Sequence, residues 1–176
     1  LDIGCGAGIF LHEMRTLGWD VYGVEPSKDH YMYSQKNLNL EVFNGLFDDY
    51  KIDIKFDLIY LSHIFDDLSN VSYVINKIKQ LLSDKGIVFI EVPNFSRTNK
   101  LEINDGDLIE NNFYYTCDTL VSILDKNGLK VSYVDTFEPI YSNTLTQQML
   151  FPFNYLKRLF LSKNNKSHIR VICQKN

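Results

Sequence analysis

The sequence of 176 residues is poor in cysteine, has no cysteine pair at a metal-binding spacing and contains no long apolar run. Its cysteines, Cys5, Cys117 and Cys173, are odd in number and far apart, so they indicate neither a disulfide framework nor a zinc site. The four histidines are also scattered, and no two of them lie one helical turn apart, as a helical metal site requires. We therefore predict no metal and a reducing, cytoplasmic location.

No stretch reaches the roughly 18 to 20 continuous apolar residues that a membrane span needs, and no charged-then-apolar leader opens the chain. Apolar residues make up 45% and charged residues 23%, which excludes disordered and collagenous proteins. The length fits one domain over residues 1–176. Because no methionine begins the chain and hardly any residues precede the first glycine, we expect an N-terminal segment to be missing.

The two signs of charge are distributed unevenly along the chain. All 22 acidic residues lie within residues 1–138, whereas residues 139–176 contain six basic residues and no acidic one. Six basic residues on an otherwise acidic chain make a small footprint for a polyanion, so we predict no nucleic-acid partner. The basic tail instead indicates a surface that differs from the rest of the domain.

Residues 137–167 form a predicted insert between the last two strands, and a structureless loop of that length is uncommon. Within the insert, residues 152–163 begin with Pro152 and carry apolar side chains on one side, near Lys157 and Arg158. This pattern predicts a short amphipathic helix. Three roles are open for it: packing on the sheet edge, a lid over the acceptor site, or peripheral contact with an anionic membrane or a partner.

Apolar, strand-like runs alternate with segments of helical spacing along most of the chain. The predicted strands are Trp19–Val24, Phe56–Leu61, Gly86–Val92, Lys130–Thr136 and Ile169–Cys173, and the predicted helices are Ile9–Leu17, Val71–Leu82 and Thr119–Asn127. Strands and helices that alternate in this way predict an α/β domain with a doubly wound, mostly parallel sheet.

Glycines at alternate positions, Gly4, Gly6 and Gly8, lie between the first apolar run and the helical pattern that follows it. Because they have no Cβ, the backbone can turn tightly and a ligand can approach to contact distance. Their spacing differs from the Gly-x-Gly-x-x-Gly of dinucleotide-binding domains, which disfavours an NAD-dependent enzyme. Asp2, just before the loop, adds a negative charge that suits a cationic or zwitterionic ligand.

Glu25 ends the apolar run Val21–Val24 and is expected at the tip of the second strand. A carboxylate at that place can accept hydrogen bonds from both hydroxyls of a ribose, as in dinucleotide-binding folds. The alternative is a local role, in which Glu25 starts the turn into the next helix and caps that helix. The preceding glycine loop favours ribose binding.

Three stretches, Leu1–Gly8, Phe56–Leu68 and Gly86–Asn94, share features of one enzyme family. They resemble the first motif, the fourth-strand motif and the fifth strand of class I S-adenosylmethionine-dependent methyltransferases, and the resemblance runs to about Thr136. The most similar subgroup comprises ubiquinone-biosynthesis-like and sugar C-methyltransferase-like enzymes. This resemblance implies a Rossmann-like fold with a seven-stranded, mostly parallel sheet whose last strand is antiparallel, and S-adenosylmethionine as the cofactor.

The resemblance also implies roles for single residues. Gly4 and Gly6 are expected against the methionine moiety of the cofactor. Asp2 is expected to orient its amino group, and Glu25 to hold its ribose. The loop Asn44–Asp48 is expected to bracket the adenine. The cofactor-binding residues implied in this way are Asp2, Gly4, Cys5, Gly6, Glu25, Leu46 and Ser62.

His63 is the single candidate for a catalytic residue. It follows the fourth strand at the carboxyl edge of the sheet, where folds of this kind bind their ligands, and it could take a proton from the methyl acceptor as a general base. The alternative is that His63 begins the next helix and packs or caps there. The second histidine of the family motif is replaced by Asp67 in this chain.

These features predict an enzyme, an S-adenosylmethionine-dependent methyltransferase that acts on a small molecule such as a sugar or a quinone precursor. The cofactor supplies the electrophile, so the protein needs only to align the acceptor and remove its proton. The alternative is a non-catalytic cofactor-binding or accessory domain of the same fold, because histidines of the family motifs are missing.

Overall fold

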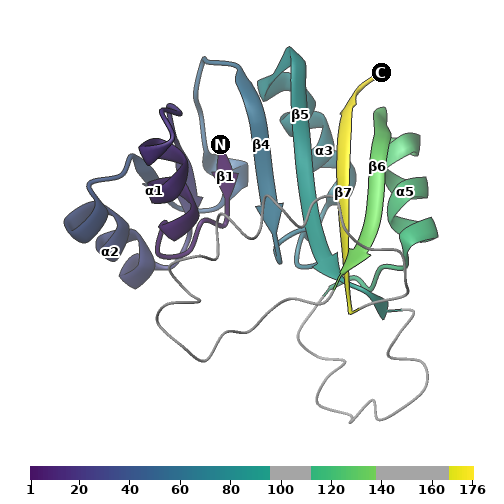
Figure 1. Ribbon diagram of the computed structural model, residues 1–176, viewed down its shortest axis with the longest axis horizontal. Coiled ribbons are helices and arrows are strands. Elements are labelled where there is room, and N and C mark those ends of the chain that lie inside the picture. Colours follow the sequence, from purple (N-terminus) through teal and green to yellow (C-terminus); the bar gives the residue numbers. More distant parts are fainter. Residues whose placement is uncertain (96–111, 138–166) are drawn as a thin grey trace, which may run out of the picture.

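The computed structural model describes residues 1–95, 112–137 and 167–176 (Figure 1). Helices and strands alternate along the chain, as the sequence predicts. The elements are β1 (Asp2–Ile3), α1 (Ile9–Thr16), β2 (Gly23–Glu25), α2 (Lys28–Leu38), β3 (Val42–Asn44), the short 3-10 helix η1 (Phe47–Asp49), β4 (Phe56–Ser62), α3 (Val71–Leu81), β5 (Leu82–Pro93), α5 (Cys117–Lys126), β6 (Leu129–Phe137) and β7 (His168–Lys175).

The strands form one seven-stranded sheet in the order β3-β2-β1-β4-β5-β7-β6 (Figure 1). Strands β1 to β5 pair in parallel, and β7 runs antiparallel to both β5 and β6. The strand order reverses between β1 and β4, and ligands of open α/β sheets bind at such a switch point, beyond the carboxyl ends of the strands. The prediction of a doubly wound, mostly parallel sheet of seven strands with an antiparallel last strand is confirmed.

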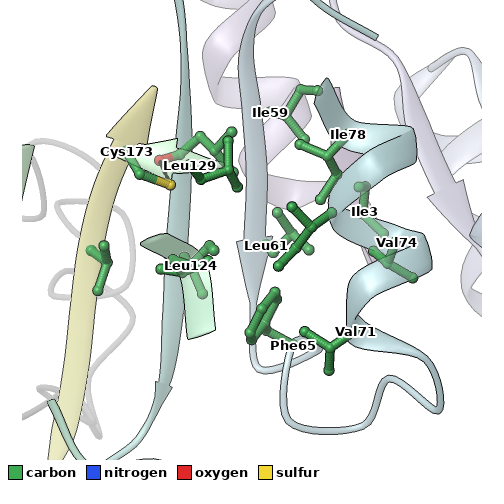
Figure 2. Packing of buried hydrophobic residues seen from close by; sticks show 14 of the residues in the cluster. Ile3, Ile59, Leu61, Phe65, Val71, Val74, Ile78, Leu124, Leu129 and Cys173 are labelled. Atoms are coloured by element: carbon green, nitrogen blue, oxygen red, sulfur yellow. Dashed lines mark hydrogen bonds between the residues drawn. The ribbon is translucent and has the colours of Figure 1, made fainter. Parts of the chain in front are cut away.

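Helices α3 and α5 cover one face of the sheet, and α1 and α2 cover the other (Figure 1). Figure 2 shows the first of these faces, where side chains of α3 pack against Ile59 and Leu61 of β4, both fully buried. Each fully buried aliphatic side chain stabilises the fold by about 1.5–3 kcal/mol. The buried stripe of α3, whose three- and four-residue spacing marks it in the sequence, is Val71, Val74, Ile75, Ile78 and Leu81.

The opposite face contains a smaller cluster, in which Leu11 of α1 packs with Leu40 and Val42. Beside this cluster, the ring of Phe10 stacks on that of Tyr60 in β4, with 4.2 Å between the centroids. Because these contacts fix α1 over the sheet, the loop from β1 into α1 is held at the carboxyl edge by apolar packing.

The second strand is shorter than predicted. The sequence predicts a strand over Trp19–Val24, but β2 begins only at Gly23. β1 pairs with β2 only through Asp2 opposite Gly23 and Ile3 opposite Val24, and Trp19 is 45% exposed. A strand needs a neighbour for its backbone hydrogen bonds, so the apolar run becomes a strand only where β1 and β3 lie beside it.

Helix α2 is not among the helices predicted from spacing. Ser34 is its only buried residue, so no apolar stripe marks the helix in the sequence. It begins instead from its cap, because the Ser27 hydroxyl accepts a hydrogen bond from the backbone N–H of His30 at 3.5 Å.

Two predicted features lie outside the described residues: nearly all of the insert 137–167, and with it the helix over 152–163. Phe137 pairs with His168, so the two ends of that insert lie side by side. Within the described ranges, no helix is long and apolar enough to cross a membrane, and the cytoplasmic location stays a prediction. In the same ranges, no group of three His, Cys, Asp or Glu side chains is placed to hold a metal ion.

Candidate functional site

Every site residue predicted from the sequence lies at or near the carboxyl ends of the parallel strands, at the lower edge of the sheet in Figure 1. We name two groups of residues after the roles predicted from the sequence. The cofactor half comprises the predicted cofactor-binding residues Asp2, Gly4, Cys5, Gly6, Glu25, Leu46 and Ser62, which lie at β1, β2, β3 and the end of β4. The acceptor half comprises the predicted base His63, together with Glu91 of β5 and His168 of β7, which the structure places beside it.

The glycine loop turns through left-handed backbone conformations, with φ of 75° at Gly4 and 53° at Gly6. The Gly4 N–H donates to the Val24 carbonyl at 2.8 Å, and a Cβ at Gly4 would overlap the side chain of Ile64. A Cβ at Gly6 would meet nothing within 4 Å. Gly4 is therefore required by the packing of the loop against the segment after β4, whereas the backbone at Gly6 is open to a ligand.

The Glu25 carboxylate ties this loop to β2. Its Oε2 accepts a hydrogen bond from the Gly6 N–H at 2.8 Å, and its Oε1 accepts one from the Ser27 N–H at 2.7 Å. The second bond supports the turn into α2, so the local role considered for Glu25 is present. Each carboxylate oxygen has more than one lone pair, which leaves capacity for ribose hydroxyls.

Asp2 brings a second carboxylate close to the loop. Its side chain is buried, and this burial raises its pKa to about 7. The charge of Glu25 adds to the increase. Two carboxylates that repel each other beside an open backbone would be stabilised by a cation bound between them.

The Cys5 side chain packs toward the protein. A Cβ added to Gly23 would lie 2.7 Å from the Cys5 Sγ, so the thiol rests on β2. Burial raises the pKa of this thiol, and the charges of Asp2 and Glu25 raise it further. The backbone N–H of Cys5 donates to the Val24 carbonyl at 3.1 Å. Cys5 therefore shapes the loop as a protonated thiol.

Leu46 is an apolar side chain that is 60% exposed. The residues before it are tied to the ribose-binding candidate: the Asn44 side chain donates to the Glu25 carbonyl at 2.9 Å, and the Gly45 N–H donates to the same carbonyl at 3.2 Å. Phe47, after it, is buried. An exposed leucine held beside Glu25 offers an apolar surface for a flat aromatic ring.

Ser62 and His63 lie where β4 leaves the sheet. Ser62 pairs with Glu91, and the His63 N–H continues the ladder by donating to the Glu91 carbonyl at 2.9 Å. His63 then has φ of 55°, and its side chain is 46% exposed. Helix α3 begins at Val71 with Asn70 as its cap, so His63 neither begins nor caps that helix.

Two residues near His63 are missing from the sequence-based site. Nε2 of His63 lies 3.5 Å from Oε1 of Glu91, and the rings of His63 and His168 are 5.0 Å apart between centroids. The signal for Glu91 was available, because it is an acid within the otherwise apolar run Gly86–Val92. His168 gives no local signal, since antiparallel β7 brings it to this edge from the far end of the chain.

The residues of the cofactor half fit S-adenosylmethionine. The open backbone at Gly6 admits a ligand, and the carboxylates of Asp2 and Glu25 suit a zwitterion that carries an additional positive charge. The exposed Leu46 suits an adenine ring.

A protein-family profile described as "Methyltransferase domain" matches residues 1–134. Among curated proteins, the Ubiquinone biosynthesis O-methyltransferase of Pelagibacter ubique (strain HTCC1062) is 31% identical over 106 residues. That match covers 53% of this chain and 41% of the relative, so the chain spans less than half of the relative's length.

Solved structures share the fold. A SAM dependent methyltransferase from Archaeoglobus fulgidus has a TM-score of 0.69 and 20% identity, covering 99% of this chain and 84% of the other. The glycopeptide N-methyltransferase MtfA, complexed with S-adenosyl-L-homocysteine, has a TM-score of 0.68 and 13% identity, covering 99% and 80%. Since the profile spans well over half of the residues, the chain belongs to the methyltransferase domain family, with the fold of its class I S-adenosylmethionine-dependent members.

Proposed function

We propose that this protein transfers a methyl group from S-adenosylmethionine to a hydroxyl group of a small molecule. The observation that carries the proposal is the juxtaposition, at one sheet edge, of a glycine loop bonded to the Glu25 carboxylate and the half-exposed imidazole of His63. The loop suits the cofactor, and the imidazole suits an acceptor that must lose a proton.

The cofactor half binds S-adenosylmethionine and orients it. The backbone of Gly4 and Gly6 lies against the methionine part of the cofactor, and the Asp2 carboxylate attracts its ammonium group. Glu25 accepts hydrogen bonds from the ribose, and Leu46 packs on the adenine. When bound, S-adenosylmethionine supplies a methyl group on a positively charged sulfur, which makes the methyl carbon the electrophile.

The acceptor half aligns the hydroxyl and takes its proton. His63 is followed by Ile64, whose side chain abuts Gly4, so the backbone at His63 is one residue away from a contact with the loop that would hold the methionine part. The acceptor oxygen bonds to the methyl carbon as the carbon–sulfur bond breaks, and the hydroxyl proton passes to His63. Alignment of the reacting atoms is the larger contribution of the protein to such a displacement.

Quinone precursors and sugars are the expected acceptor classes, since both present hydroxyl groups. The similarity to an enzyme named for O-methylation in ubiquinone biosynthesis supports a small acceptor of this kind. We further propose that residues 1–176 act as one domain, with 137–167 as an insert between the last two strands.

Calorimetry and a methyl-transfer assay on the full-length protein test the proposal. We expect binding of S-adenosylmethionine and S-adenosylhomocysteine, and transfer of labelled methyl to one member of a panel of polyphenols, quinols and sugar nucleotides. Glu41→Ala, which removes an exposed carboxylate at the start of β3, is the control that should change neither. Absence of binding contradicts the proposal outright. Binding without transfer to any acceptor would favour a non-catalytic cofactor-binding domain.

A further inference from the structure

A carboxylate is buried in the sheet beside the acceptor half. Glu91 of β5 lies between Ile90 and Val92, which are fully buried, and is itself only 5% exposed. Its Oε1 is 3.5 Å from Nε2 of His63, and its backbone carbonyl accepts the His63 N–H at 2.9 Å. Glu91 thus contacts His63 through both its side chain and its main chain.

Burial of a carboxylate at this position opposes folding, because the charged group loses its hydration. The adjacent residues of β5 are apolar, and an apolar side chain at position 91 would continue the same strand without that cost. An acid in such a place that faces a half-exposed imidazole in the site points to a role beyond packing.

Glu91 belongs to a row of polar and ionisable side chains that crosses four strands. It lies opposite Arg170 of β7, and Arg170 lies opposite Asp135 of β6. On its other side, Glu91 pairs with Ser62, the residue before His63. Residues directly opposite each other share one face of a sheet, so an acid, a base and a second acid follow one another along the row. This alternation lowers the cost of holding a charge at Glu91.

The backbone of His63 is held in a conformation that few residues adopt. With φ of 55°, His63 lies in the left-handed region, which is costly for a residue with a Cβ. Strained backbone of this kind is concentrated at functional sites. The turn leaves the imidazole half exposed while one ring nitrogen faces Glu91, so the other nitrogen remains for an acceptor.

The carboxylates around His63 all raise the pKa of its imidazole. The hydrogen bond to Glu91 is the largest cause that raises the pKa of His63; burial opposes it, and the charges of Asp66 and Asp67 add to it. His168 of β7 packs edge-on against His63, and burial, followed by repulsion from His63, lowers the pKa of His168. Of the two adjacent imidazoles, His63 is therefore the stronger base.

We propose that Glu91 is a positioning residue that acts through His63, an inference that rests on the proposed function. The carboxylate accepts the Nε2–H of His63, which fixes the ring and leaves the lone pair on Nδ1 for the acceptor. During transfer the acceptor O–H bond breaks and its proton moves to Nδ1, while the oxygen bonds to the methyl carbon that leaves sulfur. The imidazolium formed in this step is stabilised by Glu91.

Glu91→Gln is the direct test, because glutamine keeps an acceptor oxygen and loses the charge. We expect kcat to fall about 10- to 100-fold, as is typical when the group that orients a functional histidine is changed. The KM for S-adenosylmethionine should stay the same, and the acidic limb of the kcat profile should move to lower pH. Glu91→Asp should restore part of kcat, and Glu41→Gln is the matched control. If kcat falls while the acidic limb of its pH profile stays in place, Glu91 supports only the fold and the inference is wrong.

An NMR titration of the His63 imidazole, in the protein without cofactor, separates this inference from the proposed function. Glu91→Gln should move the titration midpoint of His63 to lower pH, and an unchanged midpoint overturns the inference even if the protein proves to be a methyltransferase. A moved midpoint in a protein that transfers no methyl group overturns the proposed function, and the positioning role with it.

A second variant covers the case in which Glu91→Gln does not fold. Asparagine tolerates the left-handed backbone of position 63, so His63→Asn should keep the fold and remove the imidazole. The carboxyl carbon signal of Glu91 should then shift and lose the inflection that follows the titration of His63. A carboxyl signal that is the same in both proteins contradicts the pairing.

Discussion

The cofactor half takes most of its residues from the single stretch 2–25, whereas the acceptor half joins β4, β5 and the last strand of the chain. In the cofactor half, the central contact joins the Gly6 N–H to the Glu25 carboxylate within a single βαβ unit. In the acceptor half, His63 follows β4 and contacts Glu91 on the neighbouring strand β5. It also contacts His168 on the next strand of the sheet, β7. One half depends on local backbone geometry, and the other depends on the register of the sheet.

Because of this difference, cofactor binding and catalysis can change independently of each other. The two halves meet at the end of β4, where Ser62 is followed by His63 and the side chain of Ile64 abuts Gly4. Their other residues come from different elements, so substitutions in the cofactor half should change cofactor affinity and substitutions in the acceptor half should change turnover.

The largest effect is expected at the acceptor half. His63→Asn removes the proposed base, and loss of a general base lowers kcat by about 10²- to 10⁴-fold. The affinity for S-adenosylmethionine should stay unchanged, because His63 is not one of the residues of the cofactor half. Single-turnover kinetics with calorimetry on the same variant would measure both. A variant that keeps its turnover, or that loses cofactor affinity as strongly as turnover, would break the separation.

The next effect is expected at Glu25. Hydrogen bonds to charged groups contribute about 1.5–3 kcal/mol, so Glu25→Ala should weaken cofactor binding about 10- to 100-fold. Glu25→Gln keeps one acceptor oxygen, which can serve either the Gly6 or the Ser27 N–H group, and should lose less affinity than Glu25→Ala. Calorimetry gives the affinities, and Glu41→Ala is the exposed-carboxylate control. Equal affinity in all four proteins would exclude ribose binding by Glu25.

The same division explains how much could be predicted from the sequence. The glycine loop and the stripe of α3 are local patterns, and both were recognised because their spacing alone sets their geometry. Glu25 was recognised for the same reason, since it follows the loop by one strand and one helix.

The features that could not be predicted from the sequence depend on which strands lie next to each segment in the sheet. Trp19–Tyr22 has the composition of a strand, but β2 forms only where β1 and β3 lie beside it. His168 reaches His63 only because β7 is antiparallel to β5, and spacing along the chain carries no trace of that contact. Glu91 was visible as an acid in an apolar strand, yet its partner could be named only from the sheet register.

A moderate effect of pH on cofactor binding is expected from Asp2. Because burial raises its pKa to about 7, the carboxyl group is largely protonated below pH 7 and must lose its proton to attract the ammonium group. Affinity should therefore be level above pH 7 and fall, by at most about tenfold for each unit, below it, toward the affinity of a protein with a neutral side chain at position 2. In Asp2→Asn the affinity should be weaker and nearly independent of pH between 5 and 7. A wild-type profile as flat as that of the variant would remove Asp2 from the cofactor half.

The smallest effect is expected at Leu46, and it sharpens the comparison because the substitution leaves the fold alone. Leu46 is 60% exposed, so Leu46→Ala should leave the denaturation midpoint unchanged. Contact with adenine would bury apolar surface worth about 1 kcal/mol, so cofactor affinity should fall about fivefold. Leu17→Ala is the matched control, because Leu17 is 62% exposed and follows α1 at the opposite end of that helix from the glycine loop. If both variants bind the cofactor as the wild type does, Leu46 faces solvent in the complex and the cofactor half ends at Glu25.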